Sequence, residues 1–249
     1  MTILEMTGVE KRFPGPKGGE PVIALRGLSL AIGEGEYVCI LGKSGCGKST
    51  LLSIAAGLEK PDAGRVVCRG ETVTGPDRHR MLMFQDAALF PWLDVLDNVL
   101  YGLTFVEGLT RREKLARAED NLAMVGLSDF QRFRIHELSG GMRQRAALAR
   151  ALAPDPDILL IDEPFSALDA MTREQLYADI QRIWKETGKT ILMVTHNVRE
   201  AVCLGERVLI LSTPGEVAAN EPVNLPHPRS MNDPNLTLVA AHISTFLQG

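Results

Sequence analysis

A glycine-rich segment in the first fifth of the chain carries the residue types that can bind a polyphosphate. Residues 42–50 fit the pattern G-x-x-x-x-G-K-[S/T], in the order Gly42, Lys43, Ser44, Gly45, Cys46, Gly47, Lys48, Ser49 and Thr50. A loop that wraps a multiply charged anion must turn successive backbone N–H groups inward, and glycine permits the close approach and positive φ angles that this requires. We predict that Lys48 supplies a positive charge to the phosphates and that the Ser49 hydroxyl ligates Mg²⁺. An ordinary glycine-rich turn is the competing interpretation, but the apolar run before the segment and the helical pattern after it favour a phosphate loop.

Two adjacent acids follow a second apolar run, Ile158-Leu-Leu-Ile161. Asp162 stands where a strand would end, and in P-loop nucleoside triphosphatases a carboxylate at this place holds Mg²⁺. Glu163 is one residue further on, where it can accept a proton from an attacking water. Taken alone, the pattern also describes strand-terminal acids that face solvent. The phosphate loop elsewhere in the chain favours the catalytic interpretation.

Short apolar runs and alternating hydrophobicity predict the strands that must position these residues. Residues 28–32 alternate, and residues 37–41 form an apolar run that ends at Gly42, which is typical of a buried strand. Further strands are predicted at 64–70, 81–84, 158–161, 190–194 and 208–211. A predicted helix over 171–187 ends at Gly188 and leads directly into the strand at Thr190, a β-α-β alternation that indicates a parallel sheet. The predicted fold class is therefore α/β.

Residues 86–153 interrupt this pattern with helical signals. Thr110 and Glu113 form a capping box, and the apolar residues that follow it at helical spacing are Leu115, Ala118, Leu122 and Val125. Ser139 is the predicted N-cap of a helix over 140–153, which Pro154 ends. After Thr213 the chain is rich in proline and closes with a predicted helix over 236–247.

Composition limits the class of protein. The 249 residues are 45% hydrophobic and 23% charged, as in ordinary globular chains, and the net charge of −4 gives no support for nucleic-acid binding. No apolar run approaches the ~18–20 residues that cross a bilayer, and the N-terminus has no secretory signal. Four scattered cysteines form no metal-ligand spacing and favour a reducing compartment. We expect any membrane role to depend on a partner protein.

A second candidate anion site lies between the two phosphate motifs. Leu138-Ser139-Gly140-Gly141-Met142 is followed by Arg143-Gln144-Arg145, and the amides of Gly140 and Gly141 stand at a predicted helix N-terminus. This segment resembles the signature of ATP-binding-cassette (ABC) ATPases. The resemblance extends from about Leu4 to Leu211, with Met142 where most members of the family have glutamine.

The resemblance implies roles for further residues. It identifies Gln85 with the glutamine that contacts Mg²⁺ and the attacking water, and His196 with the histidine that bonds the γ-phosphate. Residues 166–169, Ser-Ala-Leu-Asp, are similar to the loop that communicates across the family's dimer. Phe13 is similar to the aromatic residue that stacks on adenine, although core packing is an alternative for it. The family binds ATP and Mg²⁺ between two subunits arranged head to tail, with Ser139, Gly140 and Gly141 facing the γ-phosphate on the other subunit, so a homodimer or a paired ABC ATPase subunit is expected.

The same resemblance implies a P-loop NTPase fold in a single domain, residues 1–249. In this fold, a RecA-like core with a mixed, mostly parallel sheet and an N-terminal antiparallel β region is formed by residues 1–85 and 154–213. An inserted helical subdomain is formed by residues 86–153, and a C-terminal tail by residues 214–249.

The segment between Gln85 and Leu93 is similar to importers of the nitrate, sulfonate, taurine and bicarbonate group. This similarity predicts an ATP-hydrolysing importer subunit at the cytoplasmic face of the plasma membrane. Integral-membrane permease subunits would contact residues 85–93, and a solute-binding protein would act indirectly. Two alternatives stay open: the ATPase of an exporter, and an ABC ATPase without a transport function.

Overall fold

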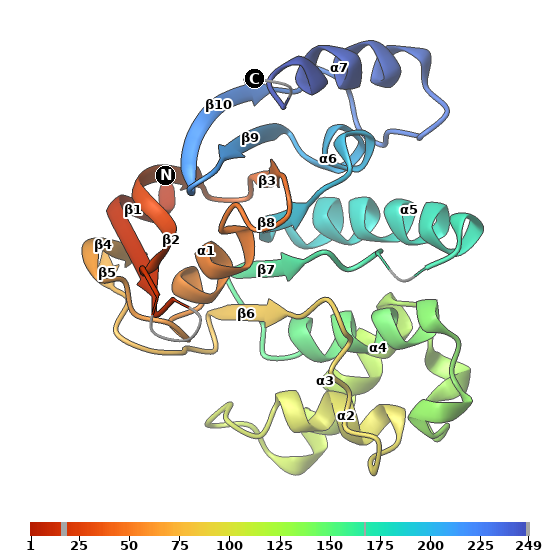
Figure 1. Ribbon diagram of the computed structural model, residues 1–249. Coiled ribbons are helices and arrows are strands. Elements are labelled where there is room, and N and C mark those ends of the chain that lie inside the picture. The colour runs from red at the N-terminus through yellow and green to blue at the C-terminus, as the bar shows by residue number, and fades with distance from the viewer. Residues whose placement is uncertain (16–18, 167, 248–249) are drawn as a thin grey trace.

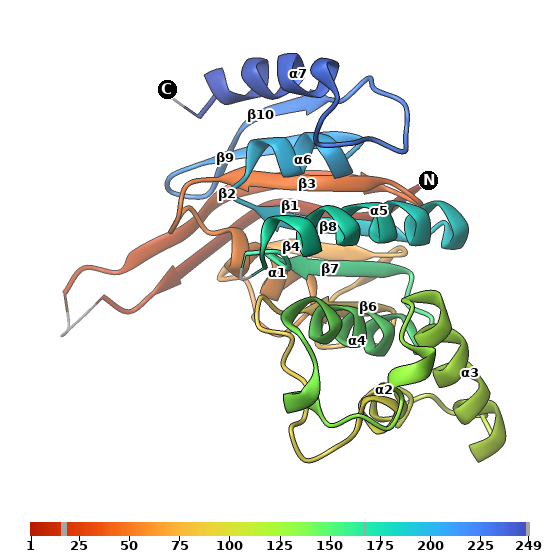
Figure 2. The same cartoon turned by 90° about the vertical axis from the view of Figure 1, so that its right-hand side faces the viewer.

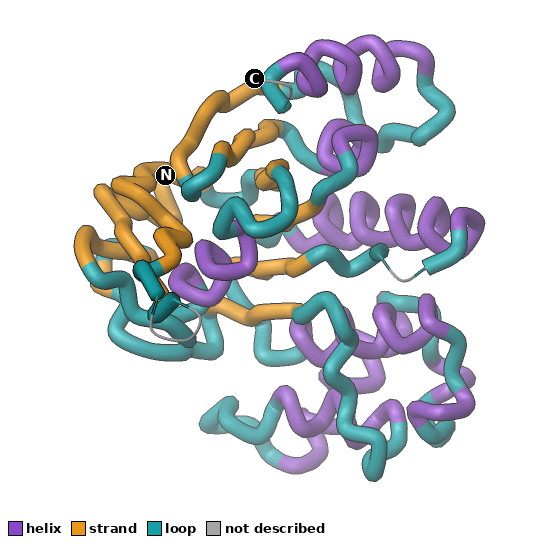
Figure 3. The backbone as a smooth tube through the Cα atoms, in the orientation of Figure 1, coloured by secondary structure: helices purple, strands orange, loops and turns teal. Residues whose placement is uncertain are grey.

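The computed structural model describes residues 1–15, 19–166 and 168–247 of the chain. Two sheets and an added group of helices make up the fold (Figure 1). In Figure 3 several strands gather on the left beside the N-terminus, others run through the middle, and helices lie to the right, at the top and at the bottom.

The larger sheet has six strands in the order β10-β9-β3-β8-β7-β6. Their bounds are β3 (Tyr37–Gly42), β6 (Arg80–Met83), β7 (Ile158–Asp162), β8 (Thr190–Thr195), β9 (Arg207–Ser212) and β10 (Glu216–Pro222). All neighbours are parallel except β10, which pairs antiparallel with β9. The predicted parallel sheet is therefore confirmed. Because parallel strands point the same way, the segments that follow β3, β6, β7 and β8 all leave the sheet at one edge.

The smaller sheet is antiparallel, in the order β2-β1-β4-β5. It contains β1 (Thr2–Phe13), β2 (Val22–Gly33), β4 (Ala63–Cys68) and β5 (Glu71–Thr72). In Figure 2 the β1–β2 hairpin extends to the left, away from the rest of the molecule. The predicted N-terminal antiparallel region is confirmed.

Alternate residues of β3 face two different hydrophobic cores. Val38 and Ile40 pack with α1 (Lys48–Ala55) and the smaller sheet, whereas Tyr37, Cys39 and Leu41 pack toward the helices on the opposite face. All five side chains are fully buried. This period of two explains why a strand buried on both faces is apolar at every position.

Helices α5 (Ala170–Thr187), α6 (Val198–Leu204) and α7 (Pro234–Thr245) contribute to the second core. The same core continues into α2 (Val95–Gly102), α3 (Arg111–Met124) and α4 (Gly140–Leu152), which form the helical part below β6 in Figure 1. The capping box of Thr110 and Glu113 is present at the start of α3. Of the four apolar residues at helical spacing there, Ala118, Leu122 and Val125 are buried, whereas Leu115 is 37% exposed.

Two predictions for the C-terminal part of the chain need correction. No strand is predicted after Thr213, but β10 extends the sheet from Glu216 to Pro222, with alternate residues exposed. No helix is predicted between β8 and β9, but α6 is there, with Asn197 as its N-cap.

Candidate active site

The phosphate loop joins the end of β3 to the start of α1. At Gly42, a Cβ atom would lie 2.5 Å from the Cys46 Sγ atom and 2.9 Å from the Leu211 carbonyl oxygen. At Gly47, the N-cap of α1, φ is 97° and a Cβ atom would lie 2.2 Å from the Ala24 carbonyl oxygen. Both positions therefore require glycine, for close approach in one case and for backbone conformation as well in the other.

The Lys48 ammonium lies inside this loop. Its Nζ atom donates to the carbonyl oxygens of Gly42 at 2.8 Å and of Lys43 at 3.0 Å, and the residue is 6% exposed. Within the described ranges Lys48 forms no ion pair with a carboxylate. A buried cation held by neutral carbonyl oxygens keeps its charge available for an anionic ligand.

Asp162 comes next to this loop through the order of the strands. It ends β7 and pairs with Val194 of β8, which in turn pairs with Ile40 of β3. Burial, and to a smaller extent the Glu163 charge, raise the pKa of Asp162, while the neighbouring Ser49 hydroxyl and Lys48 ammonium act in the opposite direction. The structure therefore brings Lys48, Ser49 and Asp162 together as the sequence predicts.

Glu163 has a strained backbone that directs it away from the sheet. Its φ is +39°, a left-handed conformation that a non-glycine residue adopts only at some cost, and its amide donates to the Val194 carbonyl oxygen at 3.1 Å. The carboxylate oxygen Oε2 lies 2.8 Å from Nδ1 of His196, which follows the end of β8. Neighbouring strand ends thus join two predicted residues that are 33 positions apart in sequence.

Gln85, which follows the end of β6, is connected to Glu163 through Ser166. Its Nε2 atom donates to Ser166 Oγ at 3.2 Å, and Ser166 Oγ donates to the Glu163 carbonyl oxygen at 3.1 Å. The Gln85 side chain therefore contacts the segment after Glu163. Within the described residues its Oε1 atom accepts no hydrogen bond.

Ser139, Gly140 and Gly141 lie at the start of α4, where the two glycines pack against Leu168 and against Thr172 of α5. Ser139 Oγ accepts from the Met142 amide at 3.3 Å. A Cβ atom at Gly141 would lie 2.2 Å from Thr172 Cγ2, and one at Gly140 would lie 3.2 Å from the Leu168 side chain. The predicted second anion site is therefore separate from the first within one chain.

Residues 166, 168 and 169 of the predicted dimer-contact loop connect β7 to α5, whereas Ala167 lies outside the described residues. The Asp169 side chain caps α5 by accepting from the Thr172 amide at 3.0 Å.

Phe13 ends β1, opposite Val22 of β2, and is 37% exposed. Val22 is two residues before Ala24, whose carbonyl oxygen faces Gly47 of the phosphate loop. The aromatic ring is therefore partly exposed on the strand pair that borders the phosphate loop, and it is not part of either core.

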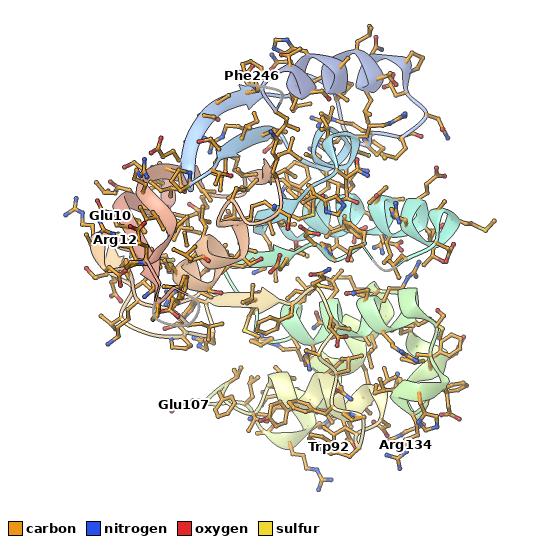
Figure 4. All side chains as sticks on the ribbon, in the orientation of Figure 1. Glu10, Arg12, Trp92, Glu107, Arg134 and Phe246 are labelled. Atoms are coloured by element: carbon orange, nitrogen blue, oxygen red, sulfur yellow. The ribbon has the colours of Figure 1, made fainter. Side chains whose placement is uncertain are left out.

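The loop between Gln85 and α2 exposes aromatic side chains beside a broad apolar hollow of about 740 Å³. Trp92 is 69% exposed, and Figure 4 shows it next to Arg134 at the lower edge of the helical part. Aromatic residues in edge or tilted contact continue from it, in the order Trp92, Phe90, Tyr101 and Phe105. The hollow is lined mainly by Leu58, Met81, Phe84, Phe90, Tyr101 and Phe105.

Two polar residues to which the sequence analysis gave no structural role hold this loop in place. Asn98 is fully buried: its side-chain amide accepts from the Phe90 amide at 2.8 Å and donates to the carbonyl oxygens of Phe90 and Asp94. Arg150 of α4 donates to the carbonyl oxygens of Ala87 at 2.9 Å and Ala88 at 2.8 Å. An asparagine within the apolar Val95-Leu-Asp-Asn-Val-Leu100 run was a visible signal, whereas nothing local marked Arg150.

The predicted oxygen ligands suit Mg²⁺. The residues that the structure describes contain no cluster of three or more His, Cys, Asp or Glu side chains that would hold a metal by themselves. Magnesium in nucleotide sites needs only one or two protein oxygens, because phosphate and water complete its octahedral shell. The Ser49 hydroxyl and the partly buried Asp162 carboxylate beside the phosphate loop meet this requirement.

This arrangement defines a P-loop nucleoside triphosphatase: a phosphate loop after a central strand, a carboxylate at the end of a nearby strand and a carboxylate–histidine pair at the same edge. The ABC transporter family matches residues 25–166. The taurine import ATP-binding protein of Roseobacter denitrificans is 46% identical over 218 residues, which cover 87% of this chain and 81% of that protein. That of Burkholderia thailandensis is 52% identical over 197 residues, which cover 79% of this chain and 75% of that protein.

A dimeric ATP-binding cassette bound to ADP and phosphate in a post-hydrolysis state has a similar structure, with a TM-score of 0.78 and 35% sequence identity. The likeness covers 90% of this chain and 100% of that one. The chain belongs to the ABC transporter family and is an ATP-binding, ATP-hydrolysing cassette. None of the helices within the described ranges combines the length and apolar character that crossing a bilayer demands.

Proposed function

We propose that this chain is the ATP-hydrolysing subunit of an importer for a small sulfonate such as taurine. Two relatives at about half identity are taurine import proteins, which favours import over the exporter and non-transport alternatives. The observation that carries the enzymatic part is the convergence of the phosphate loop, Asp162 and the Glu163–His196 pair at one edge of the sheet.

Each residue at this edge has a distinct task in hydrolysis. The phosphate-loop amides and Lys48 bind and orient the triphosphate, and Glu163 accepts a proton from the attacking water. His196 bonds the γ-phosphate and is held beside Glu163 by their 2.8 Å contact. Phe13 stacks on the adenine ring. Bound Mg²⁺, held by Ser49, Asp162 and the Oε1 atom of Gln85, would supply positive charge to the phosphate oxygens.

The site is completed by a second ATPase subunit. In the part of the chain that the structure describes, Gly140 and Gly141 pack against Leu168 and Thr172 and not against the phosphate loop. A helix N-terminus with free amides attracts an anion. We assign them to the γ-phosphate bound by the other subunit, in a homodimer or a paired assembly arranged head to tail. The dimeric form of the similar cassette supports a pairing of two such subunits.

The aromatic hollow beside residues 85–93 is the proposed contact with an integral-membrane permease. An exposed tryptophan at the rim of an apolar hollow is typical of an interface anchor, because it buries a large area at a low cost in rotamer entropy. The subunit would then be peripheral, at the cytoplasmic face of the plasma membrane, and a solute-binding protein outside that membrane would select the solute. Nucleic acid is not a proposed partner.

The experiment that tests the enzymatic role is Glu163→Gln, assayed for turnover and for assembly. The amide cannot accept the proton, so we expect ATP binding to persist, turnover to fall by about 10²-fold or more, and a stable dimer to form with Mg·ATP. Hydrolysis at the wild-type rate would refute the role of Glu163. Lys48→Ala is the matched comparison: it should weaken ATP binding itself, and an unchanged affinity would refute the assignment of the phosphate loop.

A further inference from the structure

A buried carboxylate lies directly behind the proposed catalytic histidine. Glu200 of α6 is 5% exposed, and each of its oxygens accepts a hydrogen bond from a hydroxyl group. Tyr177 of α5 donates to Oε1 at 2.6 Å, and Thr195, the last residue of β8, donates to Oε2. Both donors are almost fully buried, at 2% and 1% exposure.

These bonds continue to both chain neighbours of His196. Thr195 Oγ1 accepts from the Asn197 amide at 3.0 Å, and the Asn197 side chain accepts from the Glu200 amide at 3.3 Å. The residues before and after His196 are therefore tied to Glu200. The His196 side chain itself is 62% exposed, and among the described residues its hydrogen bond is to Glu163. The orientation of the imidazole thus depends on the backbone that Glu200 fixes.

Glu163 and Glu200 line one small cavity of about 60 Å³, together with Arg173, Thr195 and His196. Arg173 also donates to the Leu168 carbonyl oxygen at 2.7 Å. The α5 side of the network is rigid, because the Tyr177 ring packs edge-on against Phe165 at 4.8 Å between ring centroids. The network therefore links α5, β8 and α6 at the catalytic edge, the edge of the larger sheet at which the phosphate loop, Asp162, Glu163 and His196 lie.

We propose that Glu200 is a positioning residue for hydrolysis: it holds the segment 195–197 so that His196 lies against Glu163 and the γ-phosphate. The inference rests on the proposed role of His196 and extends it to a buried residue whose carboxylate is bonded to Tyr177 and Thr195. An error of about 1 Å in such a group is enough to slow the chemical step by up to ~100-fold.

The test is a double-mutant cycle of Glu200→Gln with His196→Ala, measured as kcat and KM for ATP. The amide keeps the shape of the carboxylate but presents an N–H group to one of two hydroxyl donors. We expect kcat to fall about tenfold with KM within about twofold, and the substitution to have almost no further effect in the His196→Ala background. Amide hydrogen exchange at Asn197 and Glu200 in the nucleotide-free protein should become faster. Glu174→Gln on the exposed face of α5 is the control and should change none of these quantities.

An unchanged kcat in Glu200→Gln would overturn the proposal, and so would an equal fall in kcat with His196 present or absent. If His196→Ala hydrolyses ATP like the wild type, it is the proposed role of His196 that fails, which distinguishes the two failures. Should Glu200→Gln not fold, Tyr177→Phe carries the same test, because it removes one donor to Glu200 and keeps the ring against Phe165.

Discussion

Gly141 of the signature segment, residues 138–142, is expected to be required for packing against Thr172. We expect Gly141→Ala to destabilise the wild-type protein but to stabilise a protein in which Thr172 is replaced by a smaller residue. A Cβ atom at this position would lie 2.2 Å from Thr172 Cγ2, but the next nearest atoms are Thr172 Cβ at 3.7 Å and Leu176 Cδ1 at 4.0 Å. One methyl group of Thr172 is therefore the whole obstacle to a side chain. Thr172→Ser removes that methyl group and keeps the hydroxyl at the N-terminus of α5.

The expected magnitudes follow from two opposing contributions. Forcing a methyl group into this contact costs about 2–3 kcal/mol, and replacing glycine by alanine within a helix gains up to ~1 kcal/mol. Gly141→Ala should thus lower the free energy of unfolding by about 1–2 kcal/mol in the wild-type background. In the Thr172→Ser background the contact is ordinary, so the same substitution should raise the free energy of unfolding by about 0.5 kcal/mol.

Urea unfolding of the four proteins, followed by tryptophan fluorescence, measures this difference. An equal loss of stability in both backgrounds would refute the packing argument. The stable Gly141→Ala/Thr172→Ser protein then isolates the role of the signature in assembly. If it still forms the ATP-dependent dimer, the glycine is required for contact with α5 and not for contact with the nucleotide.

Two further predictions concern other parts of the fold. Arg150→Met should lower the free energy of unfolding, measured by the same urea titration, by about 2 kcal/mol, because it leaves the Ala87 and Ala88 carbonyl oxygens without their donor. Arg150→Lys should recover less than half of this loss, because an ammonium is a poor substitute for a planar guanidinium that also stacks on Phe90. Burial, with the nearby Arg229 and Lys185 charges, lowers the pKa of His227 from 6.5 to about 4. As the pH falls, the unfolded chain therefore protonates at His227 before the folded chain does, and about 2 kcal/mol of stability, discounted for partial exposure, should be lost between about pH 6.5 and 4. In unfolding titrations at several pH values, His227→Gln should reduce the dependence of the free energy of unfolding on pH in this range. An unchanged slope would contradict the assignment.

The catalytic edge could be predicted from sequence because its signals are local. The phosphate loop, the acids after β7 and the histidine after β8 each follow an apolar run that reads as a buried strand. One rule, that parallel strands end at the same edge, is then enough to bring them together. The order of β3, β8 and β7 in the sheet supplies the contacts that the sequence could not give.

The supporting residues could not be predicted, because their partners are distant in sequence and are backbone atoms or single hydroxyl groups. Arg150 bonds carbonyl oxygens that are 62 and 63 positions away, and Tyr177 bonds Glu200 across 23 positions. β10 was missed for a different reason. It is an edge strand whose alternate residues are exposed, and its polar composition and final Pro222 resemble a loop.

The loop that begins at Gln85, residues 85–93, is bonded both to α4 and to the segment that follows β7. Its backbone is bonded to α4, because Gln144 donates to the Gln85 carbonyl oxygen at 3.1 Å and Arg150 donates to the carbonyl oxygens of Ala87 and Ala88. The Gln85 side chain is bonded, at 3.2 Å, to Ser166 in the segment between β7 and α5. Since α4 also begins at the Ser139 cap, a displacement of this helix must either carry the loop with it or break its bonds to Gln144 and Arg150. In the first case the Gln85–Ser166 hydrogen bond must lengthen or break together with the contacts between α4 and α5, such as the Arg145–Asp179 ion pair.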